Sequence, residues 1–453
     1  MFMKTMNGKT SLIIKLGAGF FADAYDLFVI DIVMAILSEL TKTSPYGIGL
    51  DTYSKAIVSA ATSAGAVLGM LFFGFLGDHF GRISAVVTTG AIVSIGSLVS
   101  AFCVRSETFH LVHQLTLYRF LLGIGIGGEY PLSAALANEK SSPMVRSKIV
   151  AGVFSMQGVG MLASALLAYT LINVGVSLDL TWRILLGFGA VPALAAVYLR
   201  LRMNETEAYQ DHKQNHGHKT AKEKLSDMWG VLKSNRKLLI GTTSTWFLLD
   251  VTFYGTGQFK YSVSDIIFPS SSLTDTVFFA LIVSLMAIPG YLCAYAFIEK
   301  TGKWNLQVYG FVAMIACYSA MSVMAFYPVV PPYVQLFMFG LSFFFTNFGP
   351  NTTTFIIPSE IFPTAVKTTC HGLSAAVGKV GAVVGSAAFP PLKESISLGG
   401  ILISCSLVAL LGLLCTILFL PKGVVDREKY AERIGAVQKG AEVQSDKRVR
   451  DLL

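Results

Sequence analysis

An aspartate lies in the middle of the apolar stretch WFLLDVTFYG, which runs from Trp246 to Gly255. An ionisable side chain at membrane depth is costly, and it generally faces a protein interior or a wet cavity. Trp246 precedes Asp250 by four residues and Tyr254 follows it by four. In a helix, this spacing places all three side chains on one stripe. The stretch therefore predicts a polar stripe that faces an interior site.

Other apolar stretches also carry polar side chains. Asp23 and Asp26 in FFADAYDLF are three residues apart, which predicts one helical face for both. Asp31 falls on another face and nearer the outer end, where a structural or rim role is expected. The remaining polar residues of this kind are Arg119, Glu129, Tyr130, Gln157, Asn347, Asn351 and Lys379.

The side chains of this set suit a protonated oxyanion. Lys379, together with amide and tyrosine donors, favours an anion, whereas carboxylates would repel one that is fully ionised. Carboxylates instead accept hydrogen bonds from an anion that still carries protons. Dihydrogen phosphate has such protons near neutral pH and sulfate does not. The excess of acid also suggests coupled protonation, because burial disfavours an ionised carboxyl group, and the set therefore predicts symport.

The composition indicates which elements must position these residues. Of 453 residues, 53% are hydrophobic and 14% are charged, whereas soluble domains carry about a quarter charged residues. The apolar runs are long enough for helices of about 20 residues, which indicates membrane-spanning helices and not a barrel. The formal charge of +8 does not indicate nucleic-acid binding, because the basic residues fall between the apolar runs. No CxxC pair occurs, so the cysteines are interpreted as small buried hydrophobic residues.

Twelve apolar stretches predict twelve transmembrane helices in an all-α membrane protein. They divide into a six-helix bundle over residues 1–203, a linker loop over 204–236, a second six-helix bundle over 237–421 and a tail over 422–453. The early acid-bearing apolar run is interpreted as a first span and not as a signal peptide. Lys and Arg concentrate at the N-terminus, the linker, alternate loops and the tail, so both termini are predicted to be cytoplasmic.

The two halves of the sequence repeat, and matched residues are separated by the same number of positions as Arg82 and Lys303. This separation is named here the repeat offset. GFLGDHFGR and AFIEKTGK form one matched pair of loops, and NEKSSPMVR and SEIFPTAVK form the other. Acids and bases of these loops are expected to pair and to hold a cytoplasmic gate, although simple topology signalling by Arg82 and Lys303 is an alternative. The gate residues are Asp78, Arg82, Glu139, Arg146, Glu299, Lys303, Glu360 and Lys367.

The repeat offset also relates the polar residues of the two halves. Asn351 follows Tyr130 at this offset, and Lys379 follows Gln157 one position beyond it. Parallel repeats about an axis along the membrane normal are a known transporter architecture, with the site at midplane between the halves. The polar residues are therefore expected to converge on a central cavity.

Two weaker patterns carry no site. GIGIGGEY fits G-x-G-x-x-G through Gly123, Gly125 and Gly128, but no strand precedes it, so close helix packing is expected and not nucleotide binding. His212, His216 and His218 are interpreted as solvated loop residues. No cofactor, no metal and no enzymatic activity are expected.

The motifs FFADAYDLF, GDHFGR, GGEYPLSA, WFLLDVTFYG and NFGPNTTTFIIPSEIFPT together resemble the phosphate:proton symporter family of the major facilitator superfamily. The resemblance extends from the first span to the eleventh, although GDHFGR alone marks only the superfamily. It implies two pseudo-symmetric six-helix bundles and alternating access. It also implies phosphate-binding residues, which are Tyr130, Gln157, Trp246, Asp250, Tyr254, Asn351 and Lys379.

The resemblance further implies proton transfer through Asp23, Asp26 and Glu129. Glu129 departs from the family, which usually has Asp in GGDYPLSA, and its carboxyl reaches one methylene further. A plasma-membrane location follows by analogy, and a functional monomer is expected. Three alternatives stay open: a sugar or organic-anion symporter on the same fold, a phosphate sensor without transport, and sodium in place of the proton.

Overall fold

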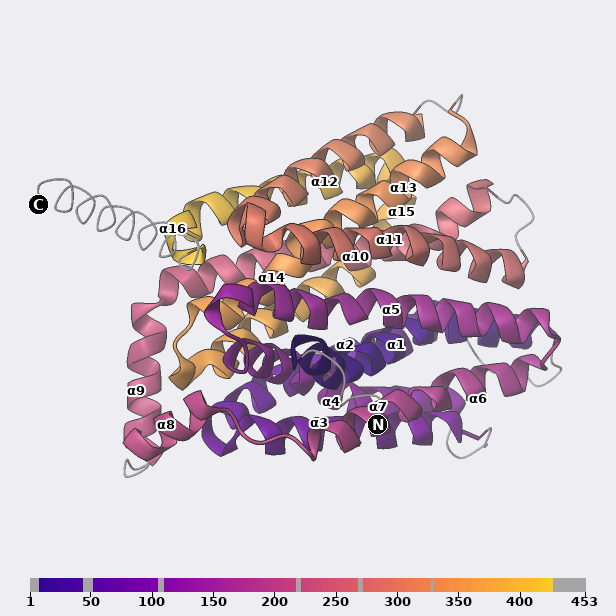
Figure 1. Ribbon diagram of the computed structural model, residues 1–453. Coiled ribbons are helices and arrows are strands. Elements are labelled where there is room, and N and C mark those ends of the chain that lie inside the picture. The colour runs from indigo at the N-terminus through magenta and orange to yellow at the C-terminus, as the bar shows by residue number, and fades with distance from the viewer. Residues whose placement is uncertain are drawn as a thin grey trace, which may run out of the picture.

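The structure is a computed structural model that describes residues 8–43, 52–104, 110–216, 221–267, 272–326 and 330–426. These residues form helices joined by short connections, and none of them lies in a strand. Most of the helices run roughly along one direction, and their ends gather at two opposite ends of the molecule (Figure 1). An all-helical protein was predicted, and this prediction is confirmed.

The first half of the chain forms seven helices. Their bounds are α1 (Gly8–Thr43), α2 (Thr52–Phe80), α3 (Arg82–Ala101), α4 (Leu111–Glu139), α5 (Arg146–Asn173), α6 (Leu178–Phe188) and α7 (Ala190–Arg200). The predicted sixth span is thus divided into α6 and α7 at Gly189. A Cβ atom at Gly189 would meet the Asp26 carboxyl carbon at 2.6 Å, so glycine at this break makes room for a buried acid of α1.

The linker is largely helical and not the loop that was predicted. It contains α8 (Glu207–His216) and α9 (Ala221–Ser234), which lie at one end of the molecule, here named the linker end (Figure 1). The sequence of α9, AKEKLSDMWGVLKS, has apolar residues at helical spacing among charged ones. His218 and the side chains of His212 and His216 lie outside the described residues.

The second half of the chain contains longer helices with internal breaks. Their bounds are α10 (Arg236–Ile267), α11 (Leu273–Thr301), α12 (Lys303–Phe326), α13 (Pro332–Phe348), α14 (Pro350–Ile361), α15 (Lys367–Phe419) and α16 (Lys422–Val425). The predicted tenth span breaks between α13 and α14 at Gly349, ahead of Pro350, which lacks an N–H donor. The predicted eleventh and twelfth spans form the two parts of α15, which meet at a kink at Ile396 and Ser397.

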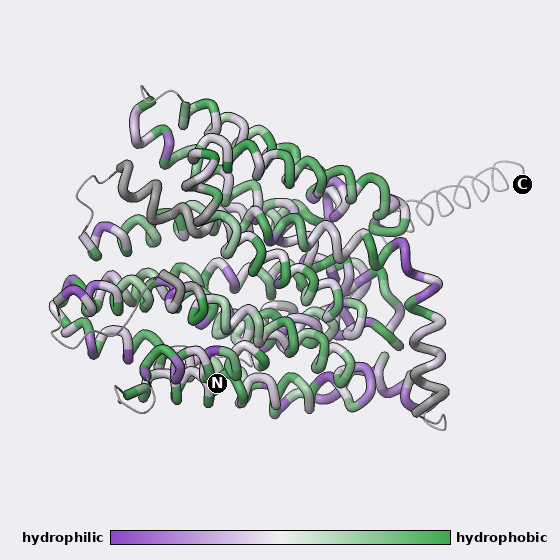
Figure 2. The backbone as a smooth tube through the Cα atoms, turned by 180° about the vertical axis from the view of Figure 1, so that it is seen from behind, coloured by the Kyte–Doolittle hydropathy of each residue, from purple (hydrophilic) through white to green (hydrophobic). Residues whose placement is uncertain are grey.

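Within the described residues, nine helical segments are long and apolar enough to cross a membrane. The three other predicted spans correspond to α1, α10 and the α13–α14 pair. α1 and α10 carry buried acids singled out from the sequence, whereas the break at Gly349 divides the tenth span into helices of 17 and 12 residues, each too short to cross a membrane alone. Hydrophobic residues cover long stretches of the helices, whereas hydrophilic residues concentrate at the linker end (Figure 2).

Helices of the two halves meet most extensively between α5 and α11 and between α2 and α15, and α4 also packs against α15. At the contact between α2 and α15, backbone faces backbone, because a Cβ atom at Gly74 would meet Gly372 Cα at 3.3 Å. Inside the first bundle, a Cβ at Gly125 of α4 would meet Thr89 O of α3 at 2.9 Å. Close helix packing through the GIGIGGEY glycines was predicted, and the structure confirms it.

The sequence repeat recurs in the loop structure. Gly81 and Gly302 end α2 and α11 with φ values of 108° and 88°, and such positive values favour glycine. Glu205 accepts a hydrogen bond from Ile83 N at 3.1 Å. Its counterpart at the repeat offset, Asp426, accepts one from Lys303 N at 2.9 Å. An acid thus binds the backbone after each glycine turn.

Candidate functional site

Lys379 of α15 lies among aromatic rings and one carboxylate in the interior of the protein. It is 2% exposed, and its ammonium group donates a hydrogen bond to the Tyr254 hydroxyl. Lys379 Nζ lies 3.7 Å from Asp250 Oδ2, and 4.2 and 5.4 Å from the ring centres of Tyr254 and Tyr130. Its counter-charge, the Asp250 carboxylate, is beyond hydrogen-bond distance, so the ammonium keeps the capacity to donate to an anion.

Amide side chains from both bundles form a second part of the site. Gln157 Nε2 of α5 donates to the Tyr130 hydroxyl at 3.2 Å. Asn351 Nδ2 of α14 donates to Gln157 Oε1 at 3.1 Å and to Asn347 Oδ1 at 2.7 Å. The Asn351–Gln157 bond crosses between the halves of the chain, and the three bonds together join α4, α5, α13 and α14.

Trp246 completes the set that the sequence predicted. Its ring centre lies 6.4 Å from that of Tyr130. A Cβ atom at Gly378 would meet Trp246 Cδ1 at 2.5 Å, so glycine lets α15 approach the indole closely. The structure therefore brings together all seven residues predicted to bind phosphate, through ring contacts, ion pairs and hydrogen bonds.

Two buried polar atoms of the site have no hydrogen-bond partner among the described residues. They are an acceptor, Asp250 Oδ2, and a donor, Asn347 Nδ2. Leaving such a group unpaired costs about 1–3 kcal/mol, and a bound water, ion or ligand is a common partner of such groups. A ligand with both hydrogen-bond donors and acceptors would satisfy both atoms.

Tyr291 of α11 belongs to the same cluster, and the sequence analysis missed it. Its hydroxyl donates to Gln157 Oε1 at 2.8 Å and accepts from Asn351 Nδ2 at 3.1 Å. A Cβ atom at Gly158 would meet its ring carbons at 2.7 and 2.8 Å, so this glycine admits the tyrosine. Tyr291 therefore orients the two amides of the site.

The acids predicted to carry protons lie in three different environments. Asp26 accepts a 2.6 Å hydrogen bond from Ser97 Oγ and lies 3.4 Å from Arg119 Nη1. Glu129 lies 2.5 Å from Arg200 Nη1. Asp23 has no ion pair in the described part of the chain, and its Oδ2 is buried and unpaired. Asp23 and Asp26 were predicted to share one face, but their surroundings differ.

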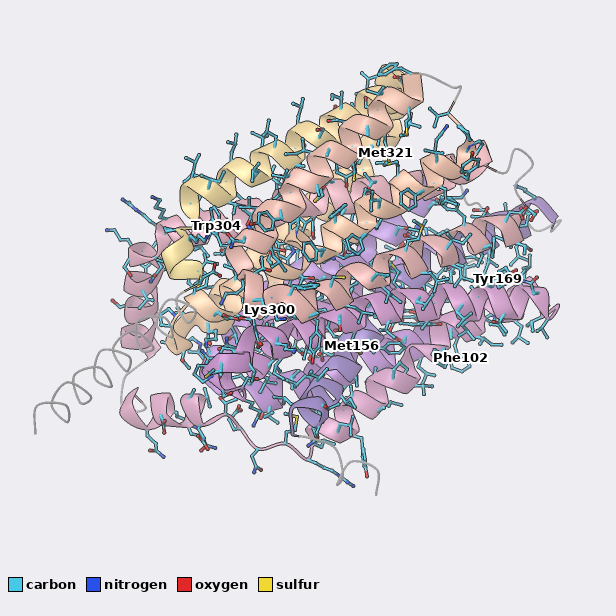
Figure 3. The ribbon with its side chains drawn as sticks, turned by 45° about the horizontal axis from the view of Figure 1, so that its top comes forward. Phe102, Met156, Tyr169, Lys300, Trp304 and Met321 are labelled. Atoms are coloured by element: carbon cyan, nitrogen blue, oxygen red, sulfur yellow. The ribbon has the colours of Figure 1, made fainter. Side chains whose placement is uncertain are left out.

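The loop motifs form ion pairs across neighbouring helices at the linker end. Arg82 lies 3.2 Å from Asp78 and 3.1 Å from Glu139. Lys303 pairs with Glu360, which repeats the Arg82–Glu139 pair at the repeat offset. Arg146 Nε donates to the Asn138 carbonyl at 3.1 Å. Glu299 is the residue before Lys300, which Figure 3 shows near Trp304 and far from Tyr169.

Several of these loop residues also join the two bundles. Asp78 accepts hydrogen bonds from the backbone of Thr368 and Thr369, at 3.2 and 2.8 Å. Arg82 donates to Thr364 O at 3.0 Å, and Lys367 donates to Asn138 Oδ1 at 2.7 Å. The linker end is therefore closed in this conformation.

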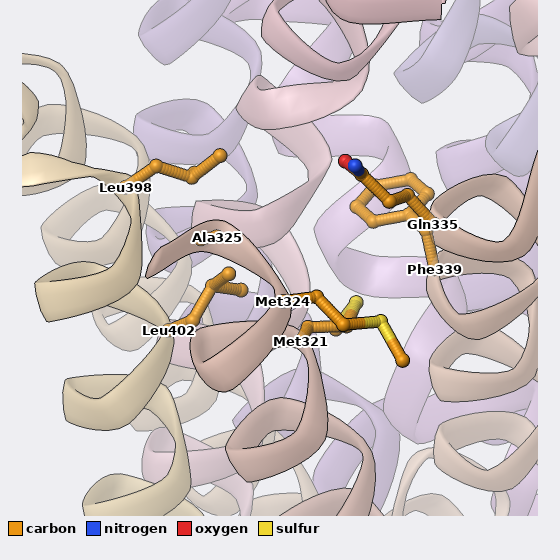
Figure 4. Close-up of a pocket in the computed structure, with 7 residues that line it drawn as sticks. All are labelled: Met321, Met324, Ala325, Gln335, Phe339, Leu398 and Leu402. Carbon is orange, nitrogen blue, oxygen red and sulfur yellow. The ribbon is translucent and has the colours of Figure 1, made fainter. Parts of the chain in front are cut away.

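An apolar pocket lies elsewhere, between α12, α13 and α15 (Figure 4). Its lining contains methionine, leucine and phenylalanine side chains with Gln335 as its one amide. None of the predicted site residues lines it. This pocket offers no charged group that could bind an anion. The cluster around Lys379 combines a buried ammonium with amide groups, which makes it the candidate functional site.

A family described as "Sugar (and other) transporter" matches residues 11–248 and 218–427. The chain belongs to this transporter family. The family membership that the motifs implied is thereby confirmed, and the family is one of membrane transporters and not of enzymes.

Relatives within this transporter family align over most of the chain. A probable inorganic phosphate transporter 1-6 of Arabidopsis thaliana is 33% identical, with 91% of each chain covered. Inorganic phosphate transporter 1-1 of Oryza sativa subsp. japonica is 35% identical and covers 83% of this chain, with 82% of its own length aligned.

Solved structures of transporters share the fold. A proton:xylose symporter of the major facilitator superfamily, bound to 6-bromo-6-deoxy-D-glucose, superposes with a TM-score of 0.77 at 18% identity, covering 93% of this chain and 98% of its own. A human organic anion transporter superposes with a TM-score of 0.68 at 14% identity, covering 91% and 100%. This transporter-family chain therefore has the predicted major facilitator fold.

Proposed function

We propose that this protein imports inorganic phosphate across a membrane by proton symport, through alternating access, with dihydrogen phosphate as the favoured form. The observation that carries the proposal is the cluster around Lys379. A buried ammonium, amide donors and a carboxylate oxygen that accepts no hydrogen bond among the described residues lie within one group of contacts. The relatives named as inorganic phosphate transporters support the same substrate.

The arrangement of charge supports a protonated anion. Lys379 and the Gln157 and Asn351 amides supply donors to phosphate oxygens. Asp250 Oδ2 lies 3.7 Å from Lys379 Nζ but accepts no hydrogen bond within the described part of the chain, and a P–OH group of dihydrogen phosphate would donate to it. An anion without such a hydrogen would instead face a carboxylate, and a mismatch between buried polar groups gives strong discrimination.

The acids of the first bundle support coupling to protons. Asp23, Asp26 and Glu129 are all buried, and intramembrane acids are typical of proton relays. Protonation there reduces the negative charge near the anion site, so proton and phosphate binding favour each other. Reciprocal coupling of this kind is what a symporter requires.

Alternating access is supported by the contacts between the halves. The linker end is closed by Asp78, Arg82 and Lys367, and breaking these bonds would open the site to that side. We place the linker end and both termini in the cytoplasm and the protein in the plasma membrane. The two bundles of one chain suffice for the motion, so a monomer is the working unit.

Purified protein in liposomes tests the proposal. Radiolabelled phosphate uptake is measured with an imposed inward proton gradient, without a gradient, and with a protonophore that dissipates it. We expect accumulation only with the gradient. Matched uptake assays use labelled xylose, an organic anion and a sodium gradient at constant pH.

Each other outcome identifies an alternative. Uptake of xylose or of the organic anion but not of phosphate would support another substrate on the same fold. Phosphate binding without uptake would support a sensor. Accumulation driven by sodium at constant pH would replace the proton as the coupled ion.

A further inference from the structure

Lys367 is a buried cation at the linker end that forms no ion pair among the described residues. It is 7% exposed, and the bases that form ion pairs at this end are Arg82 and Lys303. Its ammonium donates to Asn138 Oδ1 at 2.7 Å, which uses one of three N–H groups. Lys367 also begins α15, where the helix dipole disfavours a cation. Because buried charges are generally paired, this ammonium is suited to an anionic ligand.

Asn138 holds a second unused donor at the same place. It is 1% exposed, and its Nδ2 group has no hydrogen-bond partner in the described part of the chain. Its Oδ1 accepts from Lys367, and its carbonyl oxygen accepts from Arg146 Nε at 3.1 Å. Arg146 and Lys367 are counterparts at the repeat offset and begin α5 and α15. Equivalent bases of the two halves thus hold one asparagine and leave its Nδ2 group as a donor.

The acids near Lys367 do not balance the bases there. The charged groups that act on Lys367 are Glu139, Arg146, Arg82 and Glu360. Glu139 lies 3.1 Å from Arg82 and accepts a hydrogen bond from Thr206 Oγ1 at 2.6 Å. With Lys367 included, three bases face two acids, so an excess of positive charge remains that attracts an anion.

Glu360 supplies an acceptor near these donors. One of its oxygens pairs with Lys303, and the other, Oε1, is buried without a hydrogen-bond partner among the described residues. An ammonium, an amide and a carboxylate oxygen that accepts no hydrogen bond there are also the groups around Lys379. The linker end therefore repeats the chemistry that suits a protonated phosphate.

Asn138 and Lys367 lie on the linker-end side of the candidate site, along two helices that contribute to it. Asn138 follows Tyr130 by two turns of α4, about 12 Å along the helix axis. Lys367 precedes Lys379 by about three turns of α15. These two helices pack against each other. An anion that leaves Tyr130 and Lys379 toward the linker end would therefore pass these donors.

His371 lies along the same stretch of α15, one turn after Lys367. Its Nε2 atom is 2.9 Å from the Phe355 carbonyl oxygen. Its Nδ1 atom is buried and has no partner within the described ranges. The ring centre of His371 is 5.5 Å from that of Trp246 in the candidate site. Polar groups thus continue from Trp246 to Lys367.

We propose that Lys367 and Asn138 form a second phosphate-binding site, which receives the anion from the Lys379 site when the linker end opens. Glu360 Oε1 accepts from a P–OH group there. The proposal rests on the proposed phosphate transport and adds a release site to it. In the closed conformation, the donors of Lys367 and Asn138 hold the bundles together. An arriving anion competes for these donors, so its binding favours opening.

The test measures phosphate exchange from each side of the membrane, with equal pH on both sides. Full-length protein is reconstituted in liposomes, and an affinity tag on the tail separates vesicles with the linker end outside from those with it inside. The apparent KM for phosphate is then determined for the linker side and for the opposite side. A release site contributes to the linker-side KM alone.

Two substitutions change the closure of the linker end in opposite directions. Lys367→Gln breaks the bond to Asn138 and strands no carboxylate, because Lys367 forms no ion pair within the described residues. Asn138→Asp gives Lys367 an ionic partner, which tightens the closure, and it removes the amide donor. Both variants weaken an anion site, so we expect both to raise the linker-side KM about tenfold or more, with no rise on the opposite side.

A bond that serves closure alone predicts a different pattern. A looser linker end is open more of the time, which lowers the apparent KM on that side, and a tighter one raises it. Thr369→Val is the matched control for loosening, because the Thr369 hydroxyl donates to Asp78 Oδ2 across the bundles at 2.8 Å and carries no charge. We expect the linker-side KM of Lys367→Gln to exceed that of Thr369→Val.

Every other outcome decides against one part of the account. Opposite shifts in Lys367→Gln and Asn138→Asp, no shift in either, or equal rises on both sides would overturn the second site and leave phosphate transport intact. Wild-type protein that exchanges no phosphate would overturn the proposed function itself. If size-exclusion chromatography shows that Lys367→Gln does not fold, Asn138→Leu replaces it, because it also loosens the closure and removes a donor.

Discussion

The Tyr291 hydroxyl donates a 2.8 Å hydrogen bond to Gln157 Oε1 and thereby joins the two halves of the chain at the candidate site. Because Gln157 Oε1 accepts this bond, its Nε2 group is directed to the Tyr130 hydroxyl. The Tyr130 hydroxyl hydrogen then stays available to a ligand. A residue outside the predicted set thus fixes the hydrogen-bond direction of two residues within it.

Removing this hydroxyl should weaken phosphate binding. We expect Tyr291→Phe to raise the apparent KM for phosphate about two- to tenfold, because a net hydrogen bond contributes about 0.5–1.5 kcal/mol. Tyr295→Phe is the matched control, since Tyr295 lies one turn further along α11 and its ring contacts Lys148, at 5.0 Å from Nζ. Equal KM values in the two variants would remove Tyr291 from the site.

Lys379 and Asp250 should contribute to binding and to stability in different ways. Lys379→Met leaves a buried carboxylate without its cation, which costs about 3–5 kcal/mol. We expect loss of phosphate binding and a lower thermal midpoint. The double variant Lys379→Met, Asp250→Asn should regain the midpoint but not the binding, as measured by calorimetry.

Asp250→Asn alone should abolish phosphate transport, because a carboxylate has two acceptor oxygens and an amide has only one. Asp31→Asn should have a milder effect, since Asp31 lies on another face of α1. Transport in Asp250→Asn at the wild-type rate would show that Asp250 does not contact the substrate.

Selectivity against sulfate tests the role of the free acceptor. Sulfate carries no proton near neutral pH, so it should inhibit labelled phosphate uptake only weakly in the wild type. The residual phosphate binding of Asp250→Asn should discriminate less, because its site no longer holds an anionic acceptor. Competition binding with both anions measures the ratio of the phosphate affinity to the sulfate affinity. The same ratio in Asp250→Asn and in the wild type would contradict this role.

The closure of the linker end depends on Arg82. Arg82→Glu would place a carboxylate beside Asp78 and Glu139 and remove the bond to Thr364 O. We expect most of the transport activity to be lost. A cysteine introduced at the buried Ser147, in a background without the six native cysteines, should label faster than in the parent.

Lys42→Glu is the matched control for this charge reversal, because among the described residues Lys42 pairs only with Glu39, at 3.0 Å on the exposed surface, and exposed pairs contribute little. Normal transport together with unchanged labelling in Arg82→Glu would favour a role of Arg82 in topology alone.

The sequence repeat explains why so much of the site could be predicted. A polar residue in one half that has a polar counterpart in the other half stands out, as Tyr130 and Asn351 do. Tyr291 and Arg200 have no such counterpart, since the residues at the repeat offset from them are Met70 and Pro421. Their roles depend on contacts between helices, which a single sequence does not reveal.

The same reasoning explains the differences in the fold. The long apolar stretches predicted the spans, because hydrophobicity is a property of each segment. The break at Gly189 depends on the Asp26 carboxylate packed against it, and the helicity of α8 and α9 depends on packing at the linker end. Such tertiary effects override local composition.

The backbone contact between Gly74 and Gly372 has a consequence for motion. Neither residue has a side chain, so α2 and α15 can turn against each other there without any rotamer change. The contact can serve as the pivot of the two bundles, and a methyl group added at either position would obstruct rotation while leaving the anion ligands in place. We therefore expect Gly74→Ala or Gly372→Ala to slow transport and to leave the affinity for the substrate unchanged.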